Sequence, residues 1–185
     1  MIYDSVAEDA GWLGFKQNRL DAFALETCIL EAGNGDYLEV GVRLGGSALF
    51  AAIVKSAAKQ SGEIYGIDLF NLNPSKGVTP EAVLRRFSQH GMKINLTVAN
   101  SNPWPLPDIR PVVALIDGSH NYEPCLSDWN NLKTRAERFI LFHDYKTDKR
   151  DSVYGVIEIA KQDPNWHFID AVGWMAIFER YHKAQ

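Results

Sequence analysis

The sequence is poor in cysteine, has no long apolar stretch and lacks an excess of basic residues. Its two cysteines, Cys28 and Cys125, form no Cys-x-x-Cys pair, which argues against a disulfide framework and favours two small core residues in a reducing compartment. No apolar run approaches the roughly 18 residues that a membrane-spanning helix needs. The formal net charge is −4, with acidic and basic residues interspersed, so no broad basic face is available for nucleic acid. We therefore expect a soluble, cytoplasmic protein that binds neither membranes nor nucleic acids.

The chain is nevertheless long and apolar enough for one well-filled core. It has 185 residues, of which 46% are apolar, and it shows no internal repeat or low-complexity tract. We predict one domain over residues 1–185, composed of an N-terminal helical segment at 1–33 and a core at 34–185.

Helical and strand-like patterns alternate along most of the chain, which is typical of parallel β-α-β units. Helices are predicted at about 19–32, 45–59, 79–91, 122–136 and 153–162, and strands at about 37–42, 63–69, 93–98, 112–116 and 138–142. The proline-rich segment 102–107 predicts a loop in place of one crossover helix. Two last strand-like runs, 166–172 and 174–179, are separated only by Gly173, which favours an antiparallel hairpin. The predicted fold is α/β: a Rossmann-like, doubly wound, mostly parallel sheet of seven strands, with this hairpin at its edge and helices on both faces.

The strongest functional signal is a glycine-rich turn between the first predicted strand and the helix that follows it. Gly41, Gly45 and Gly46 allow the backbone to pass close to a ligand. Glu39 places an acceptor near the carboxyl end of the strand, where open α/β sheets bind their ligands. We therefore predict a site for a small polar ligand at this turn.

The residues between these glycines disfavour two common nucleotide sites. Gly41 and Gly46 have the outer spacing of a dinucleotide fingerprint, but Arg43 holds the place of its middle glycine. The same two glycines have the span of a P-loop, but Ser47 stands where the phosphate-binding lysine is needed. NAD, FAD, ATP and GTP are thus poor candidates for the ligand.

Acidic residues stand near the ends of the first two predicted strands. Glu39-x-Gly41-x-x-x-Gly45, with Asp68 after the second strand, is the pattern of S-adenosylmethionine sites. The chain resembles the class I S-adenosylmethionine-dependent methyltransferases, and more narrowly the small family that includes macrolide-sugar O-methyltransferases and cephalosporin hydroxylase-like proteins. The resemblance covers nearly everything after about residue 30. It rests on Leu38-Glu39-Val40-Gly41 with Gly45-Gly46-Ser47, Tyr65-Gly66-Ile67-Asp68, Ile116-Asp117-Gly118-Ser119-His120-Asn121-Tyr122 with Asp128 further on, and His143-Asp144-Tyr145.

The resemblance implies a cofactor and the residues that bind it. The implied cofactor is S-adenosylmethionine, and the implied binding residues are Glu39, Gly41, Gly45, Asp68, Ser101 and Asp117. The two glycines and Glu39 would border its methionine part. Asp68 would accept hydrogen bonds from the ribose hydroxyls, and Ser101 would lie near adenine. The chemistry of Asp68 supports its role independently, because a carboxylate can accept from two neighbouring hydroxyls.

His120 is the candidate general base. Methyl transfer from a sulfonium needs an acceptor oxygen that is in line with the methyl group and relieved of its proton. A histidine titrates close to working pH, and His120 stands in a predicted loop after an acidic strand end. The resemblance supports this role, because the histidine of the Asp-Gly-x-His motif acts as base in the family. The alternative is that His120 caps the helix that follows.

Asp117 and Asp144 are the candidate metal ligands. They end adjacent strands if the strand order is the usual one, and two carboxylates in one cleft repel unless a proton or a cation lies between them. A divalent ion, with magnesium favoured by oxygen ligands, would hold the acceptor hydroxyl and lower its pKa. The alternative is that Asp117 caps a helix and Asp144 pairs with Lys146. His143 stands where the related sugar methyltransferases carry an acidic residue, which leaves the ligand set and the choice of metal open.

The leading hypothesis is an S-adenosylmethionine-dependent O-methyltransferase for a hydroxyl of a small molecule, such as a sugar or another secondary metabolite. The main alternative is a non-catalytic S-adenosylmethionine- or nucleoside-binding protein of the same fold. A nucleotide-sugar enzyme is disfavoured by the lack of a diphosphate turn. Methylation of nucleic-acid bases is disfavoured because Asp-Gly-Ser-His stands where an Asn/Asp-Pro-Pro-aromatic motif is expected. The short N-terminal segment is a candidate for acceptor recognition. Trp12 and Phe15 near that end are instead candidates for a contact in a homo-oligomer.

Overall fold

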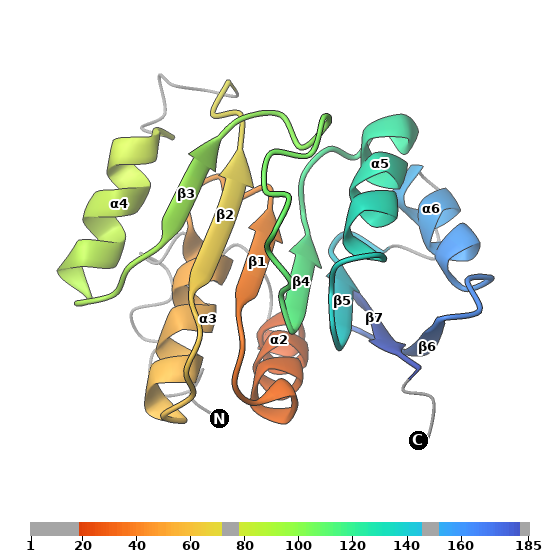
Figure 1. The fold of residues 1–185 in the computed structure, drawn as a ribbon, viewed down its shortest axis with the longest axis horizontal. Helices are drawn as coiled ribbons and strands as arrows, with labels where there is room; N and C mark the ends of the chain where they lie inside the picture. Colours follow the sequence, from red (N-terminus) through yellow and green to blue (C-terminus); the bar gives the residue numbers. More distant parts are fainter. Residues whose placement is uncertain (1–18, 72–77, 146–151, 182–185) are drawn as a thin grey trace.

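The computed structural model describes residues 19–71, 78–145 and 152–181. Helices and strands alternate in these ranges as the sequence predicts (Figure 1). The strands are β1 (Tyr37–Val40), β2 (Ile64–Asp68), β3 (Asn95–Val98), β4 (Val113–Ile116), β5 (Phe139–Phe142), β6 (Trp166–Val172) and β7 (Met175–Arg180). The helices are α2 (Arg19–Ala32), α3 (Gly46–Ala57), α4 (Pro80–Gln89), α5 (Tyr122–Leu132) and α6 (Ser152–Ala160). Trp12, Phe15 and Lys146 lie outside the described residues.

The strands form one mixed sheet in the order β3-β2-β1-β4-β5-β7-β6. β1 to β5 run parallel, β7 runs antiparallel to β5, and β6 pairs antiparallel with β7. This arrangement confirms the predicted α/β sheet with its antiparallel edge hairpin. The strand order changes direction between β1 and β4, and open α/β sheets bind their ligands at such a switch point.

The central parallel strands end level with one another. Val40 at the end of β1 pairs with Ile116 of β4, and Ile116 pairs with Phe142 of β5. The residues that follow these three strand ends therefore meet at the carboxyl edge of the sheet. They are Gly41, Asp117 and His143.

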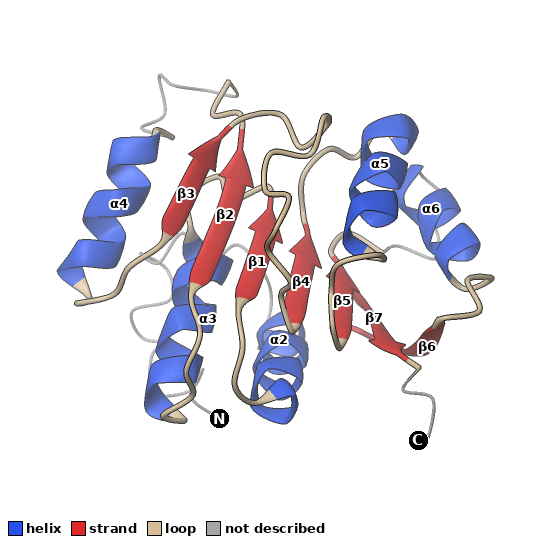
Figure 2. Ribbon diagram, viewed as in Figure 1, coloured by secondary structure: helices blue, strands red, loops and turns tan. Residues whose placement is uncertain are grey.

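Helices cover both faces of the sheet (Figure 1, Figure 2). Side chains of α2, α3 and α4 form one core cluster with Leu115 and Leu141 of the central strands. The other cluster surrounds Trp129 of α5, whose ring centroid lies 5.7 Å from those of both Phe142 and Phe178. β4 and β5 are thus buried on both sides, which explains why their sequences are continuous apolar runs.

The predicted loop between β3 and β4 is confirmed. Trp104, Leu106 and Ile109 of this loop pack against the core cluster that contains α5 and α6. The indole Nε1 of Trp104 donates to the carbonyl of Leu106 at 2.7 Å. The loop therefore covers apolar surface that a crossover helix would cover in a fully regular doubly wound sheet.

α2 buries two charged residues, Asp21 and Glu26. Of its apolar residues, Leu25 and Ile29 are buried, but Phe23 and Leu30 are about half exposed. Asp21 is instead fully buried. The helix contacts α3 and the strands β4 to β7, and this placement brings Asp21 to the functional edge of the sheet.

Some element boundaries differ from the prediction where turn residues intervene. β1 ends at Val40 rather than at residue 42, because Gly41 takes a φ of +94° and leaves the extended conformation. α5 ends at Leu132 rather than at residue 136. The start of α4 is as predicted, since the hydroxyl of Thr79 accepts a hydrogen bond from the N–H of Ala82 at 3.2 Å.

Both cysteines are buried free thiols, as the sequence predicts. Burial raises the pKa of the Cys28 thiol to about 12. Within the described ranges, no helix combines the length and the apolar character needed to cross a membrane.

Candidate active site

The predicted site residues gather at the carboxyl edge of the parallel strands. Gly41 follows β1, Asp68 ends β2, Asp117 follows β4, and Asp144 lies two positions past β5. The level strand ends described above bring the first and third of these residues into direct proximity. The fold therefore assembles the two halves of the predicted site from segments far apart in the sequence.

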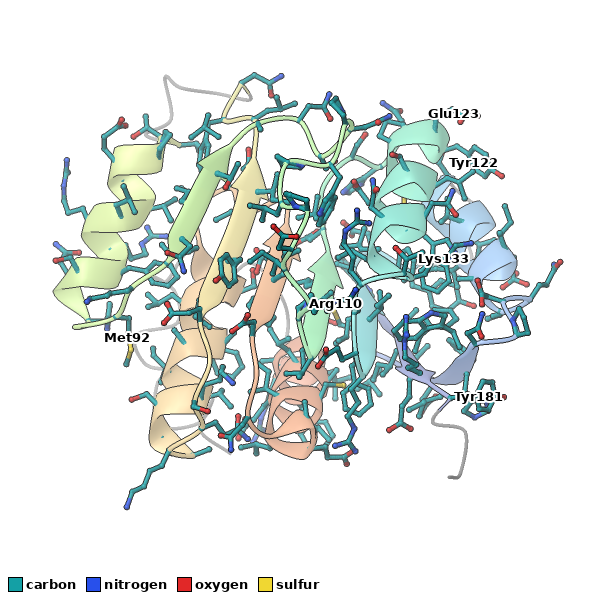
Figure 3. The ribbon with its side chains drawn as sticks, in the orientation of Figure 1. Met92, Arg110, Tyr122, Glu123, Lys133 and Tyr181 are labelled. Atoms are coloured by element: carbon teal, nitrogen blue, oxygen red, sulfur yellow. The ribbon has the colours of Figure 1, made fainter. Side chains whose placement is uncertain are left out.

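The loop that carries His120 leads directly into α5. Figure 3 shows Tyr122 and Glu123 at the start of this helix, at the carboxyl edge of the sheet, and Lys133 at the helix's other end. The N-cap residue is Asn121, whose side chain makes no capping hydrogen bond. The N-cap position is therefore held by neither His120 nor Asp117.

Gly41 permits a close approach that any side chain would prevent. A Cβ at this position would lie 2.2 Å from the carbonyl oxygen of Asp117. Gly45 also has a positive φ, of +76°, and a Cβ there would lie 2.9 Å from Val83 of α4. Both glycines are thus required by the packing of the turn itself. Their contact with a cofactor stays a prediction.

Glu39 is fully buried, and both of its carboxylate oxygens accept hydrogen bonds. The hydroxyl of Tyr37 donates to Oε2 at 2.8 Å, and the hydroxyl of Ser47 donates to Oε1 at 2.7 Å. Burial raises the pKa of Glu39 to about 8, even though the bond from Ser47 lowers it. Glu39 therefore ties β1 to the first turn of α3. Direct contact with the methionine part of a cofactor stays a prediction.

Asp68 joins the loops that follow β1 and β2. Its Oδ2 accepts from the backbone N–H of Arg43 at 2.7 Å, and its Oδ1 accepts from the N–H of Phe70 at 2.7 Å. Arg43 and Phe70 have φ values of +49° and +51°, a conformation that side chains rarely adopt. Because each carboxylate oxygen has a second lone pair, Asp68 keeps acceptor capacity for the hydroxyls of a ligand.

Ser101 lies beside Asp128 of α5. Burial raises the pKa of Asp128 to about 6, although a hydrogen bond with the Ser101 side chain lowers it. The carboxylate of Asp128 would lie 3.6 Å from a Cβ on Gly118. Ser101 and Asp128 thus connect the loop before β4 to the loop after it. The predicted position of Ser101 near adenine is untested by these contacts.

Asp117, His120 and Asp144 form a cluster with the spacing of metal ligands. One donor atom from each lies within 4.8 Å of the others. Nε2 of His120 lies 3.1 Å from Oδ2 of Asp144. The side chain of His120 is 60% exposed, whereas that of Asp144 is only 14% exposed. The structure therefore brings the predicted base and the predicted metal ligands to one place.

His143 is a site residue that the sequence interpretation did not assign. Its Nδ1 lies 3.2 Å from Oδ1 of Asp117 and 3.2 Å from Oδ2 of Asp144. Its Nε2 lies 3.5 Å from Oδ2 of Asp21. Burial would lower the pKa of His143, but the three carboxylates outweigh that effect and raise it to about 11. The signal in the sequence was the departure of this position from the acidic residue of related enzymes.

Asp21 is the second residue that the sequence interpretation missed. Its Oδ1 accepts a hydrogen bond from the backbone N–H of Trp174, in the turn between β6 and β7, at 2.6 Å. A single aspartate in the first turn of a helix gives no local signal for such a role. The contact exists because α2 packs under the strands whose ends form the site.

No known family description matches the sequence, and no curated protein matches it significantly. Solved structures do match its fold. The O-methyltransferase NovP matches with a TM-score of 0.72 at 17% identity, over 88% of this chain and 80% of NovP. CalS11, a TDP-rhamnose 3′-O-methyltransferase of calicheamicin biosynthesis, matches with a TM-score of 0.63 at 17% identity, over 89% of this chain and 78% of CalS11.

A third similar structure contains S-adenosylhomocysteine, the product that S-adenosylmethionine leaves after methyl transfer. The methyltransferase PaMTH1 of Podospora anserina, solved with S-adenosylhomocysteine bound, matches with a TM-score of 0.69 at 14% identity, over 97% of this chain and 88% of PaMTH1. These similarities confirm the fold that the sequence motifs implied. The chain has the Rossmann-like fold of the S-adenosylmethionine-dependent O-methyltransferases.

Proposed function

We propose that this protein is an S-adenosylmethionine-dependent O-methyltransferase that acts on a hydroxyl of a small molecule, such as a sugar or another secondary metabolite. One observation carries the proposal. On a fold shared with O-methyltransferases, the cluster of Asp117, His120 and Asp144 lies at the same sheet edge as Asp68 and the Gly41 turn. A ligand bound at the switch point between β1 and β4 is thus within reach of both groups.

The ends of β1 and β2 suit the methyl donor. Asp68 retains acceptor capacity for the ribose hydroxyls, and the turn at Gly41 lets the backbone approach a ligand closely. Among proteins of this fold, TomG of Streptomyces achromogenes was solved with S-adenosylmethionine and PaMTH1 with S-adenosylhomocysteine. These structures support S-adenosylmethionine as the cofactor of this chain.

His120 is the proposed general base. S-adenosylmethionine, when bound, would supply the methyl group. The acceptor hydroxyl must lose its proton as its oxygen bonds to the methyl carbon and the bond from that carbon to sulfur breaks. Nε2 of His120 lies 3.1 Å from Asp144, so a proton on Nε2 is held there and Nδ1 is left to accept the hydroxyl proton. Because His120 is largely exposed, an acceptor molecule can reach it.

Asp117 and Asp144 are the proposed holders of a divalent cation, and the spacing of the cluster supports this assignment. Such an ion, when bound, lowers the pKa of a coordinated hydroxyl. The protein's own part is to fix the two carboxylates at adjacent strand ends and to present His120 beside them.

Calorimetric titration with S-adenosylmethionine and S-adenosylhomocysteine tests the proposal. We expect micromolar binding to the wild-type protein. In Asp68→Ala the affinity should fall at least about 10-fold, because hydrogen bonds to a charged group contribute about 1.5–3 kcal/mol. Asp36→Ala is a matched control, since Asp36 also accepts a backbone N–H, that of Glu63 at 2.8 Å, but at the amino edge of the sheet.

The outcomes separate clearly. Asp36→Ala should bind both ligands as the wild-type protein does. If neither ligand produces heat with the wild-type protein, the methyltransferase proposal fails. If Asp68→Ala binds as tightly as the wild-type protein, the assignment of Asp68 to the ribose fails.

A further inference from the structure

His143 presents a buried ring nitrogen to two carboxylates without a normal hydrogen bond. Its side chain is only 10% exposed. Neither ring nitrogen has a hydrogen-bond partner among the described residues, although Nδ1 lies 3.2 Å from oxygens of both Asp117 and Asp144. One N–H group has one direction and cannot serve two acceptors well. The nitrogen is thus aimed into a group of donor atoms rather than bonded to one of them.

These distances match the spacing of donors around one small cation. Nitrogen and oxygen ligands bind first-row ions such as zinc at about 2.0–2.2 Å, so adjacent donors around the ion lie about 3 Å apart. The two separations of 3.2 Å from Nδ1 of His143 are close to this value. A cation that binds His143, Asp117 and Asp144 would form a bond to one donor atom of each, in place of the unbonded contacts between the nitrogen and the two oxygens.

Asp21 lies where a carboxylate commonly orients a metal-binding histidine. Its Oδ2 lies 3.5 Å from Nε2 of His143, the nitrogen that faces away from Asp117 and Asp144. The backbone N–H of Trp174 fixes its other oxygen. Histidines that bind metals almost always turn their second ring nitrogen to a carboxylate, a carbonyl or water. The full burial of Asp21 is accounted for by this role.

We propose that Asp117, His143 and Asp144 form a mixed nitrogen and oxygen site for a first-row transition ion such as Fe²⁺, Co²⁺ or Zn²⁺, in preference to Mg²⁺. Imidazole suits these ions, whereas Mg²⁺ takes oxygen ligands. His120 is outside this donor set and keeps its role as base. The inference rests on the proposed function for what the ion does, but the binding of the ion can be measured independently.

A protonated His143 that serves as an internal cation is the rival explanation. An imidazolium between Asp117 and Asp144 would balance their charge and leave no place for a metal. Such a group would be expected to donate directed N–H bonds to its carboxylates. The three carboxylates raise the pKa of His143 to about 11, so the metal-free ring carries a proton. Both ring nitrogens nevertheless lack directed bonds among the described residues, and this geometry favours a site that an ion enters by displacing that proton.

Titration of the metal-free protein with CoCl₂ and with MgCl₂, both without S-adenosylmethionine, tests the inference. Calorimetry should show that Co²⁺ binds at least about 100-fold more tightly than Mg²⁺, because a nitrogen donor favours the transition ion. The visible absorption spectrum of the Co²⁺ form should report coordination by the protein. In His143→Asp the affinity for Co²⁺ should fall at least about 10-fold and that for Mg²⁺ should rise.

Two further variants separate ligation from general effects on folding. Asp21→Asn should weaken Co²⁺ binding about 10-fold to 100-fold, as expected when the partner of a metal-binding histidine is altered. His167→Asp is the matched control, because His167 lies on β6 and its Nδ1 contacts the hydroxyl of Tyr181 at 3.2 Å. It should change neither affinity. Thermal unfolding of each variant establishes that it is folded before titration.

Three results would overturn the inference: no binding of Co²⁺ by the wild-type protein, equal affinity for the two ions, or unchanged Co²⁺ affinity in His143→Asp. Failure of the proposed function would give a different experimental result. If Co²⁺ binds as expected but S-adenosylmethionine does not, the metal site stands and the methyltransferase proposal fails.

Discussion

The two halves of the sheet's carboxyl edge hold their charged groups in different ways. At the ends of β1 and β2, the oxygens of Glu39 and Asp68 accept hydrogen bonds of 2.7–2.8 Å from hydroxyls and backbone N–H groups. At the ends of β4 and β5, His143 lies 3.2 Å from two carboxylates without a hydrogen bond among the described residues. The carboxylates of the first half are fixed by directed hydrogen bonds, whereas in the second half His143 lies among carboxylate oxygens without a directed bond from its own ring nitrogens.

Glu39 and His120 differ sharply in exposure. Glu39 is fully buried, and its burial fixes the turn that begins α3. His120 in the second half is largely exposed to solvent. A change in the first half should therefore act on stability and cofactor affinity together. A change of the exposed His120 should act on the reaction and leave stability almost intact.

The largest effect is expected from His120→Ala. Loss of a general base typically lowers kcat by about 10²–10⁴-fold, and we expect that loss for transfer to any hydroxyl acceptor found by screening. Cofactor affinity and the melting temperature should stay close to wild type, because the side chain is exposed and outside the first half. Formation of S-adenosylhomocysteine measures the rate, and calorimetry measures the affinity.

His167→Ala is the control for this variant, because it removes a histidine at the far edge of the sheet. It should leave the rate unchanged. Full activity of His120→Ala would contradict the role of the base. A wild-type protein that binds S-adenosylmethionine but methylates no acceptor would favour the non-catalytic alternative.

Gly41→Ala should affect stability most among changes in the first half. The new Cβ would overlap the backbone of Asp117, so the ends of β1 and β4 must separate. Positive φ contributes about 1 kcal/mol of strain, and overpacking adds about 1–3 kcal/mol. We expect a loss on the order of 3 kcal/mol in the free energy of unfolding, measured by urea denaturation, together with weaker cofactor binding.

Gly91→Ala separates these two causes. Gly91 also has a positive φ, of +68°, but a Cβ there would have nothing within 4 Å. Its loss of stability should therefore be limited to the conformational strain, about 1 kcal/mol. Equal losses in the free energy of unfolding of Gly41→Ala and Gly91→Ala would show that the close approach of Gly41 to Asp117 does not contribute to the effect.

Local patterns predicted most of the fold. Apolar runs such as residues 113–116 marked the buried strands, and Thr79 with Pro80 marked the start of a helix. Glycine at position 173 predicted the antiparallel hairpin that β6 and β7 form. Each of these patterns involves only a few neighbouring residues. Each predicts correctly because the local conformation that it favours is the one that the sheet requires at that position.

The part of the site that the sequence did not predict depends on contacts between distant segments. Asp21 and Trp174 meet only because α2 packs beneath the edge hairpin. The apolar residues of α2 do not by themselves indicate its orientation, since Phe23 and Leu30 are apolar but about half exposed. Asp117 and Asp144 lie close together, with donor atoms within 4.8 Å of each other, as strand order alone predicts. The position of His143 between them depended on side-chain geometry, which no sequence pattern encodes.

The most direct measure of how completely hydrogen bonds fix the first half should come from Glu39→Gln. Burial raises the pKa of Glu39 to about 8 from an ordinary value of 4.5, so the folded state prefers the neutral acid. Its contribution to stability is fully present below pH 4.5 and is lost as the pH rises through 8. Glutamine does not titrate. Between pH 5 and pH 8.5, the stability of the variant relative to wild type should therefore rise by on the order of 4 kcal/mol, measured by urea denaturation. The bonds from Tyr37 and Ser47 that the amide disturbs add a constant cost, which leaves this slope unchanged. If the stability difference between variant and wild type does not change with pH, Glu39 is already ionised in the folded protein. The first half would then hold a charged carboxylate at neutral pH, as the second half does.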